Sequence, residues 1–368
     1  MAFNRIAVYG HRGFVGSRVV AALIASGAPI TVLHRPSSDT SNLPDHVRKI
    51  EVDLLDEDAL VGALQDIDIV ISLVGDGGTD IQHGFVKAIP RTNVQLFSPA
   101  DCCLRYCEQG MRMPCMKAKE KVERASKDAG IPTSVIHVGN FAEFTLSTPA
   151  VGIDLQNNIL VYTGNSATEK VPMCTKDYVA AAYVDIFTTR PIPTVQNRTI
   201  TLSELAPTGM EIAAIMKEKH GRDPSIATRS LEEVNRTIED CISRESNFAV
   251  PAYCRKIWGT GEMMKMLPDD LWEVKDYRKA TLEDLVIGGR LESYRAIPDD
   301  TTTPPRLELT PDPAHPTSKQ YKALCKSHQI YCGTPPVPNS SNLIRSEVTE
   351  RALKAADVSL MKLSGPQT

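Results

Sequence analysis

A glycine loop between a short apolar segment and an amphipathic one is the feature that most constrains how this chain can fold. Ile6–Tyr9 has the composition of a buried strand, and Phe14–Ala25 carries apolar residues at the three- and four-residue spacing of a helix. The residues between strand and helix are Gly10-His11-Arg12-Gly13-Phe14-Val15-Gly16. Gly10 suits a tight turn, Gly13 lets the backbone approach a ligand, and Gly16 lets the helix pack closely on the strand. A loop of this kind predicts a site where helix N–H groups hold the pyrophosphate of a dinucleotide.

Short β-branched segments alternate with longer amphipathic ones from Arg5 to Val138, a rhythm typical of strand-helix-strand units. The predicted strands are Ile6–Tyr9, Ile30–His34, Val47–Val52, Ile67–Val74, Val94–Phe97 and Ser134–Val138. The predicted crossover helices include Phe14–Ala25, Asp56–Leu64 and Lys117–Ala129, the last followed by a glycine. The predicted fold class is therefore α/β, with a Rossmann-like, doubly wound parallel sheet of six strands.

The rhythm changes after residue 139, which indicates a smaller α/β lobe. Its predicted elements are a hairpin strand at Ile159–Tyr162, a helix near Asp177–Phe187, a strand at Thr199–Leu202, and helices near Met210–Lys219 and Leu231–Ile242. Beyond residue 300 a proline-rich stretch disfavours helix and central strand alike, and Ser346–Lys362 regains helical spacing. The predicted domains are a Rossmann-like dinucleotide-binding domain (1–150), a smaller substrate-binding lobe (151–300) and a proline-rich extension with a terminal helix (301–368).

Charge and apolar patterning exclude several kinds of partner. The chain has 41 Lys and Arg against 45 Asp and Glu, a net charge of −4 that is too balanced for a nucleic-acid-binding face. No uninterrupted apolar run reaches the roughly 18 to 20 residues that span a bilayer, so we expect no membrane partner. The first predicted strand starts at Ile6, which leaves no room for a signal or transit peptide and favours a cytoplasmic protein. The sequence leaves the oligomeric state open, a homodimer included.

The nine cysteines are an odd number without any Cys-x-x-Cys pair, so we expect free thiols and not a disulfide framework. Two groups of potential metal ligands fit no common zinc spacing. They are Cys102, Cys103, Cys107 and Cys115 in one group, and Cys325, His328 and Cys332 in the other. We therefore expect no metal site. His137, in a predicted strand, is expected to be a core histidine and not a base.

Arg35 follows the second predicted strand, within the sequence His34-Arg35-Pro36-Ser37. An NAD enzyme places a carboxylate at this position, where it accepts hydrogen bonds from the ribose hydroxyls. A guanidinium is permanently charged and its planar donors match phosphate geometry, so it favours the 2′-phosphate of NADPH over NADH. The alternative interpretation is an ordinary solvated loop arginine.

A series of motifs along the chain occurs in the order seen in one known family. The motifs are Gly10–Gly16, Arg35, Val52–Asp56, Ile69–Gly75, Phe97–Pro99, Met116–Val122, Gly130–Pro132 and Gly139–Phe141. In this order they resemble NmrA-like and isoflavone-reductase-like proteins, atypical short-chain dehydrogenases in which a Gly-x-x-Gly-x-x-Gly loop is common. The resemblance extends from about Ile6 to Glu233 and fades through Ser293, so the proline-rich end lies outside it.

The resemblance implies NADP(H) as cofactor and a lysine as general acid or base. In reductases of this family the lysine of the helix after the fifth strand lies beside the nicotinamide, and the matching residue here is Lys119. A lysine partly buried against a cofactor loses its charge more readily than in water, which suits proton transfer near neutral pH. The predicted cofactor-binding residues are Gly10, Arg12, Gly13, Phe14, Val15, Gly16, Arg35, Leu73, Val74, Gly75, Lys119, Asn140 and Phe141.

Several positions depart from the family pattern. The pair His11-Arg12 replaces small residues in the first loop, so that Arg12 either covers the phosphates or points to solvent. Ala100–Cys103 replaces a Ser-Glu-Phe-Gly-like stretch and alters the substrate wall. The pair Tyr-x-x-x-Lys of typical short-chain dehydrogenases is absent, because Cys115 stands four residues before Lys119.

These observations favour an NADPH-dependent reductase that acts on an alkene, imine or carbonyl of a cyclic natural product, a small-molecule substrate of secondary metabolism. Lys119 is the predicted catalytic residue, against the alternative of a surface lysine paired with Glu123. Asp76 and Asp101 follow strand ends and are either substrate carboxylates or ordinary loop acids. Three other functions stay open, namely a redox-neutral cyclase of the Pictet–Spengler type that keeps NADP(H) bound, a non-catalytic NADP(H)-sensing regulator, and a structural or interaction role.

Overall fold

A computed structural model describes residues 3–104 and 106–294 of the chain. The proline-rich extension 301–368, with its predicted terminal helix at 346–362, lies outside the described residues. Within the described ranges, no helix is both long enough and apolar enough to cross a membrane.

The N-terminal lobe is built on a parallel sheet with the strand order β3-β2-β1-β4-β5. Its strands are β1 (Ile6–Tyr9), β2 (Ile30–His34), β3 (Arg48–Glu51), β4 (Ile69–Ser72) and β5 (Leu96–Ser98). The central strand pairs through Ile6 with Ile30 on one side and with Ile69 on the other. The strand order reverses at β1, and ligands of such sheets bind at the carboxyl ends of the strands beside that switch point.

The predicted six-stranded sheet is in part wrong, whereas the α/β class with a doubly wound parallel sheet is confirmed. Strand β6 (Ser134–His137) pairs in parallel with β11 (Arg198–Thr201) as a separate ladder. It reaches β5 through an isolated bridge between Phe97 and Thr133. All three residues of β5 pair with β4, whereas only Phe97 bridges towards β6.

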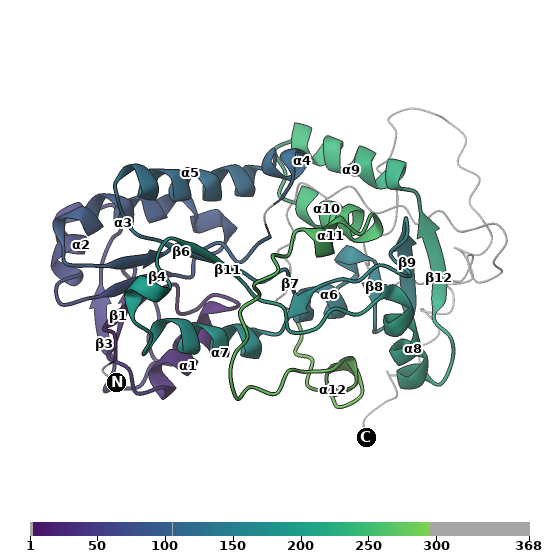
Figure 1. The fold of residues 1–368 in the computed structure, drawn as a ribbon, viewed down its shortest axis with the longest axis horizontal. Helices are drawn as coiled ribbons and strands as arrows, with labels where there is room; N and C mark the ends of the chain where they lie inside the picture. The colour runs from purple at the N-terminus through teal and green to yellow at the C-terminus, as the bar shows by residue number, and fades with distance from the viewer. Residues whose placement is uncertain (1–2, 105, 295–368) are drawn as a thin grey trace, which may run out of the picture.

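Helices cover both faces of this sheet (Figure 1). One face is covered by α1 (Gly16–Ala25) and α7 (Lys176–Phe187), and the other by α2 (Glu57–Ala63), α3 (His83–Ala88) and α5 (Pro114–Asp128). The side chains of β1 alternate between the two faces, as a strand requires. Ile6 and Val8 pack with the α1 and α7 side, whereas Ala7 and Tyr9 pack with Phe85 on the opposite side.

Two elements that pack in the core of the N-terminal lobe come from beyond residue 150, the predicted boundary between the domains. Helix α7 and strand β11 contribute Tyr178, Tyr183 and Ile200 to the same core cluster as β1 and α1. The chain therefore returns to the N-terminal lobe after it has started the smaller one. The division into 1–150 and 151–300 stays a prediction, and the packing places the segment 176–201 with the first part.

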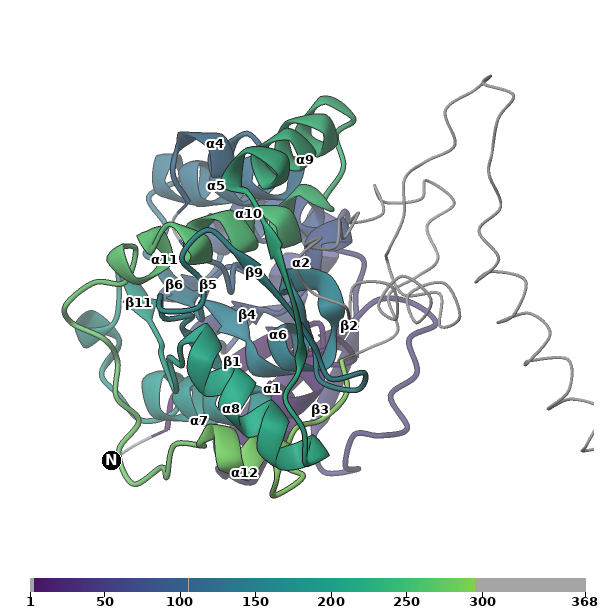
Figure 2. The same ribbon diagram turned by 90° about the vertical axis from the view of Figure 1, so that its right-hand side faces the viewer.

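The smaller lobe contains a three-stranded sheet with the order β12-β9-β8, in which β8 and β9 form the predicted hairpin. Its strands and helices are β8 (Ile153–Asp154), β9 (Ile159–Thr163), β12 (Ser225–Arg229), α6 (Ala142–Ser147), α8 (Gly209–His220), α9 (Leu231–Ser243), α10 (Ala249–Gly259), α11 (Glu262–Lys265) and α12 (Leu282–Val286). Figure 2 shows α9 and α10 at one end of this lobe and α8 with α12 at the other. The predicted helices near 210–219 and 231–242 are confirmed as α8 and α9, and each begins with a capping box, at Thr208 and at Ser230.

Short elements join the two lobes and complete the fold. They are β7 (Asn140–Phe141) paired with β10 (Met173–Cys174), helix α4 (Glu108–Met111), and 3₁₀ turns at Asp76–Gly78, Asp80–Gln82, Ile89–Arg91, Pro149–Val151 and Ile192–Thr194. Strand β7 follows β6 directly along the chain and leads from the edge of the sheet into the smaller lobe.

Candidate active site

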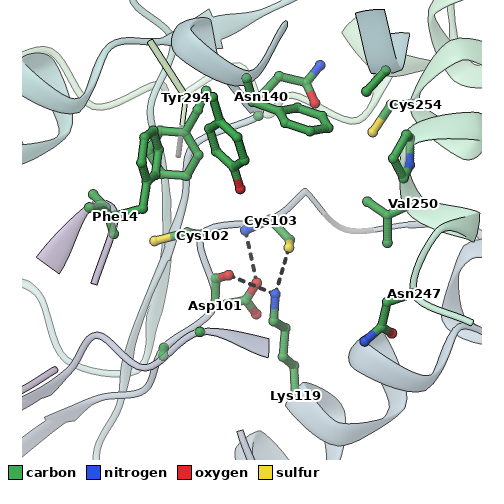
Figure 3. A pocket seen from close by; sticks show the side chains of 18 of the residues that line it. Phe14, Asp101, Cys102, Cys103, Lys119, Asn140, Asn247, Val250, Cys254 and Tyr294 are labelled. Carbon is green, nitrogen blue, oxygen red and sulfur yellow. Dashed lines mark hydrogen bonds between the residues drawn. The ribbon is translucent and has the colours of Figure 1, made fainter. Parts of the chain in front are cut away.

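A cavity of about 400 Å³ opens at the carboxyl edge of the parallel sheet, between the two lobes. One side, the sheet wall, consists of Gly13–Val15, Ser72–Gly75, Ala100–Cys103, Lys119 and Gly139–Phe141. The opposite side, the cover wall, includes Phe144, Phe248, Val250, Pro251, Cys254 and Tyr294. Figure 3 shows residues of both walls, with the side chain of Lys119 extending from its helix into the cavity. The cavity thus lies where open α/β sheets bind their ligands.

The glycine loop before α1 is crowded by the end of β4. Gly10 has a φ of 104°, and a Cβ there would lie 2.7 Å from the carbonyl atoms of Leu73. A Cβ on Gly16 would overlap the carbonyl oxygen of Gly10, so helix and loop pack without room for a side chain. A Cβ on Gly13 would meet the Gly10 and Leu73 oxygens at 3.4 Å, which is ordinary contact. Backbone strain and packing therefore require glycine at positions 10 and 16, while position 13 borders the cavity.

The loop meets the requirements for holding a dinucleotide pyrophosphate. Helix α1 begins at Gly16 and not at Phe14 as predicted, so Phe14 and Val15 belong to the loop and line the cavity. Their backbone N–H groups donate no hydrogen bond to any residue in the described part of the chain. Unpaired N–H groups at a helix N-terminus, with the helix dipole behind them, form an anion site.

The two arginines predicted to bind the cofactor lie outside the cavity lining. Arg12 is exposed, whereas its neighbour His11 is buried and contacts the carbonyl oxygen of Asp39. Arg35 is exposed directly after β2, and its charge acts on the phenol of Tyr9 at the end of β1. Both arginines therefore flank the strand ends on the solvent side, away from the enclosed part of the site. Their roles in cofactor binding stay predictions.

Lys119 is positioned by the inward face of α5. The helix starts at Pro114, a residue favoured in the first turn because it lacks an N–H group that would otherwise be unpaired. Met116 and Val122, three residues before and after Lys119, are both buried, and residues three apart share one helix face. Lys117 and Lys121, on the other side of the helix, are exposed. The side chain of Lys119 therefore points to the cavity and not to the surface.

Two hydrogen bonds fix the amine of Lys119 at the cavity wall. Its Nζ donates to the backbone oxygen of Asp101 at 3.0 Å and to the Sγ of Cys103 at 2.9 Å (Figure 3). Both acceptors lie in the segment after β5, so the lysine spans from helix to strand end. A primary amine held in a cavity beside the glycine loop can give or take a proton there.

Asp101 lies in the cavity wall as predicted, with its carboxylate engaged on two sides. One oxygen accepts the N–H of Cys103 at 3.1 Å, and the other lies 3.8 Å from Nε2 of His137. Burial opposes ionisation of this carboxyl, but the contact with His137 and the charge of Lys119 outweigh it, so the pKa of Asp101 is lowered. His137 is buried at the end of β6, as expected of a core histidine, and its Nε2 contacts the carboxylate of Asp101.

Between Asp101 and Cys103 the backbone adopts an uncommon conformation. Cys102 has a φ of 55°, in the left-handed region that costs a residue with a Cβ free energy. Its N–H is held by the carbonyl oxygen of Ile136, and its Sγ lies 3.9 Å from the hydroxyl of Tyr183. The turn at Cys102 directs the neighbouring Cys103 side chain towards Lys119.

Aromatic side chains close the cavity over the glycine loop. The ring of Phe14 lies 5.4 Å from that of Phe141 and 4.6 Å from that of Tyr294, and Tyr294 lies 5.1 Å from Phe144. The segment that carries Tyr294 is held by Glu292, which pairs with Lys176 at 2.6 Å and also with Arg18. These contacts bring residues near the end of the described chain onto its first loop.

The remaining predicted residues also lie at this edge. Leu73, Val74 and Gly75 line the cavity after β4. Asn140 is buried in β7, where its amide contacts the sulfur of Met263 at 3.4 Å. Asp76 lies in a 3₁₀ turn, and its side chain is outside the described part of the structure. The sheet wall thus gathers the predicted residues except Gly10 and Gly16, which shape the loop, the two outer arginines, and Asp76.

Sequence reasoning missed the cover wall and the contact of Cys103 with Lys119. Tyr294 lies just beyond the stretch where the family resemblance fades, so no motif pointed to it. The sequence signal for this contact was the departure of the Cys102-Cys103 pair from the family pattern. In the described ranges no group of three or more His, Cys, Asp or Glu side chains could hold a metal ion. Cys325, His328 and Cys332 lie outside the described residues.

The parallel sheet, the crowded glycine loop and the cavity at the switch point define a protein of the Rossmann-like α/β class. The model of the NmrA-like family matches residues 3–253. This chain belongs to the NmrA-like family.

Individual relatives agree with this assignment. A maize (Zea mays) isoflavone reductase homolog is 32% identical over 162 residues, which cover 40% of this chain and 52% of the relative. A Ginkgo biloba phenylcoumaran benzylic ether reductase is 25% identical over 65% of this chain and 83% of its own length. The chain thus spans about half the length of most of the curated relatives named first.

Solved structures share the fold. A crystal structure of an isoflavone reductase superposes with a TM-score of 0.64 at 20% identity, covering 78% of this chain and 99% of that one. The binary complex of leucoanthocyanidin reductase from Vitis vinifera with NADPH gives a TM-score of 0.62 at 18% identity, over 73% and 91% of the two chains. At these identities the similarity establishes the fold.

Proposed function

We propose that this chain is an NADPH-dependent reductase that acts on an electrophilic alkene, imine or carbonyl carbon of a cyclic small molecule. The observation that carries the proposal is the place of Lys119, whose amine is fixed in a cavity that also borders the glycine loop. Support also comes from relatives named as isoflavone and phenylcoumaran benzylic ether reductases and from a structural neighbour that binds NADPH.

The residues present fit an NADP(H) cofactor. The N–H groups of Phe14 and Val15 would hold the pyrophosphate, and Arg35 would bind the 2′-phosphate. When bound, NADPH supplies a hydride equivalent to the substrate. Lys119 delivers the matching proton from Nζ, and the hydrogen bonds to Asp101 and Cys103 orient the amine for this transfer. The packed rings of Phe14, Phe144 and Tyr294 would shield this side of the cavity from water.

A second candidate is a redox-neutral cyclase that keeps NADP(H) bound. The lowered pKa of Asp101 favours it, because a carboxylate that stays ionised in the cavity wall stabilises a cationic intermediate such as an iminium ion. In that reaction Asp101 would also be the acceptor of the released proton, with Lys119 in support, although a lowered pKa makes the carboxylate a weaker base. The reductase is preferred because the contacts of Asp101 with His137 and Cys103 already occupy its carboxylate.

The deciding experiment incubates the protein with NADPH and a panel of isoflavones, phenylcoumarans and lignans, and follows reduced-nicotinamide absorbance together with product mass. We expect a mass gain of two hydrogens with matching loss of NADPH. Product formed at constant NADPH would replace the reductase with the cyclase. NADPH binding without any product across the panel would favour the regulator.

A further inference from the structure

Cys103 and Lys119 form a close thiol–amine pair in the cavity wall. The two atoms Sγ and Nζ lie 2.9 Å apart, and both side chains line the same cavity (Figure 3). The proposed function uses the amine and gives the thiol no chemical part. The pair has what a nucleophilic centre needs, because an ammonium beside a thiol stabilises the thiolate, which is the reactive form.

We propose that Cys103 is a covalent modification site for α,β-unsaturated carbonyl compounds that enter this cavity. The proposal goes beyond the proposed function, since it needs neither NADPH nor hydride transfer. It rests on the 2.9 Å contact, the exposure of both groups to one cavity, and the turn at Cys102 that directs Cys103 inward.

Two other ionisable groups of the cavity lie near the pair. Asp101 is the nearest carboxylate in the wall, and its oxygens are taken up by the N–H of Cys103 and by His137. Tyr106 also lines the cavity, and burial raises the pKa of its phenol far above the usual value, so it stays neutral. Lys119 is a basic group in direct contact with the sulfur.

The reaction balances within the pair and the electrophile. The Cys103 thiolate attacks the β-carbon, a C–S bond forms, and the π electrons of the C=C bond move to the α-carbon. That carbon takes a proton from the Lys119 ammonium, which leaves a neutral amine that solvent reprotonates. No oxidant, reductant or leaving group is required. The apolar cover wall, with Phe248, Val250 and Pro251, suits a cyclic enone more than a charged electrophile.

N-Ethylmaleimide tests the proposal on the full chain, because it is a small cyclic α,β-unsaturated dicarbonyl. One equivalent is added at pH 7, and the rate of adduct formation at each cysteine is followed by intact mass and peptide mapping. The work uses the variant Cys107→Ser, because Cys107 is exposed and its thiol would compete. We expect Cys103 to react about tenfold faster than Cys102, a cavity neighbour of similar exposure whose sulfur contacts Tyr183.

Two matched variants show whether fast labelling of Cys103 depends on the Lys119 amine or only on the accessibility of the thiol. Lys119→Met keeps the apolar stem and should slow labelling of Cys103 about tenfold. Lys121→Met, on the exposed face of the same helix, should leave the rate unchanged. Labelling of Cys103 no faster than Cys102 would overturn the proposal, and this comparison within one protein holds even if Lys119→Met fails to fold. A Cys103 rate that is equal in folded Lys119→Met and in Lys121→Met would overturn it too.

Discussion

The sheet wall and the cover wall of the cavity are built from very different kinds of chain segment. Every segment of the sheet wall directly follows a parallel strand or, like Lys119, lies on a crossover helix, so backbone topology fixes its place. The cover wall comes from α6, from α10 with the residue before it, and from Tyr294, which reach the cavity through side-chain packing. From this comparison we expect the sheet wall to carry the proposed chemistry and the cover wall to set the shape of the ligand space.

The largest effect is expected from removing the amine of the sheet wall. Lys119→Met should lower the reductase rate by about 10²- to 10⁴-fold, the usual contribution of a positioned acid or base. NADPH affinity should fall far less than the rate, because the glycine loop predicted to hold the pyrophosphate is untouched. Steady-state kinetics with a converted substrate, beside calorimetric titration of NADPH, measures both. Lys121→Met is the control, and a full-rate Lys119→Met enzyme would rule out the mechanism.

A branched side chain in the glycine loop should abolish NADPH binding while the fold survives. In Gly13→Val the Cβ meets the Gly10 and Leu73 oxygens at a tolerable 3.4 Å, but its methyl groups fill space beside the N–H groups of Phe14 and Val15. Gly62→Val, at an exposed helical glycine with open space around it, serves as control. Titration calorimetry and thermal unfolding decide the matter, and normal NADPH affinity in the folded variant would contradict the assignment of the loop.

The sequence could predict most residues of the sheet wall but not those of the cover wall. The glycine at position 10 was predictable from the loop motif itself. The structure gives the reason, because a positive φ and close contact with Leu73 leave no alternative to glycine there. Lys119 was predictable through the family resemblance. Its contact with Cys103 was not, because it depends on the left-handed turn at Cys102.

The cover wall gave no comparable signal. Helix α10 was not predicted, because it is buried nearly all round, with Tyr253, Arg255 and Trp258 all hidden, so it lacks a polar face. Its Pro251 also disguises the helix, although proline is tolerated in the first turn. Tyr294 joins Phe14 across most of the chain length, a contact that no periodicity encodes.

A change in the cover wall should alter substrate binding far more than chemistry. Tyr294→Leu removes ring contacts with Phe14 and Phe144, so KM should rise by about three- to tenfold with kcat changed less than twofold. Phe3→Leu, at an exposed aromatic residue outside this cluster and outside the cavity lining, is the control. A fall in kcat as large as that of Lys119→Met would show that the two walls do not divide the work as described.

The smallest expected effect concerns the pH dependence of stability. The pKa of Asp101 is lowered in the folded state despite burial, so its ionisation stabilises the fold above the unfolded-state pKa of about 3.9. That contribution is lost as the pH falls through the folded-state value. Asp101→Asn should therefore lower the free energy of unfolding by on the order of 1 kcal/mol at pH 7, with the difference shrinking below about pH 4. Urea unfolding across this range tests it, and a constant difference would contradict the sign.

The central claim is that the carboxyl edge of the parallel sheet holds NADPH, with Arg35 beside the 2′-phosphate. Its most direct measurement is a calorimetric titration of wild type and Arg35→Asp with NADPH and with NADH. We predict that wild type binds NADPH at least about tenfold more tightly and that Arg35→Asp removes this preference, because a carboxylate repels the phosphate and accepts from a free ribose hydroxyl. Equal affinity of the wild type for both cofactors, or binding of neither, would contradict the account.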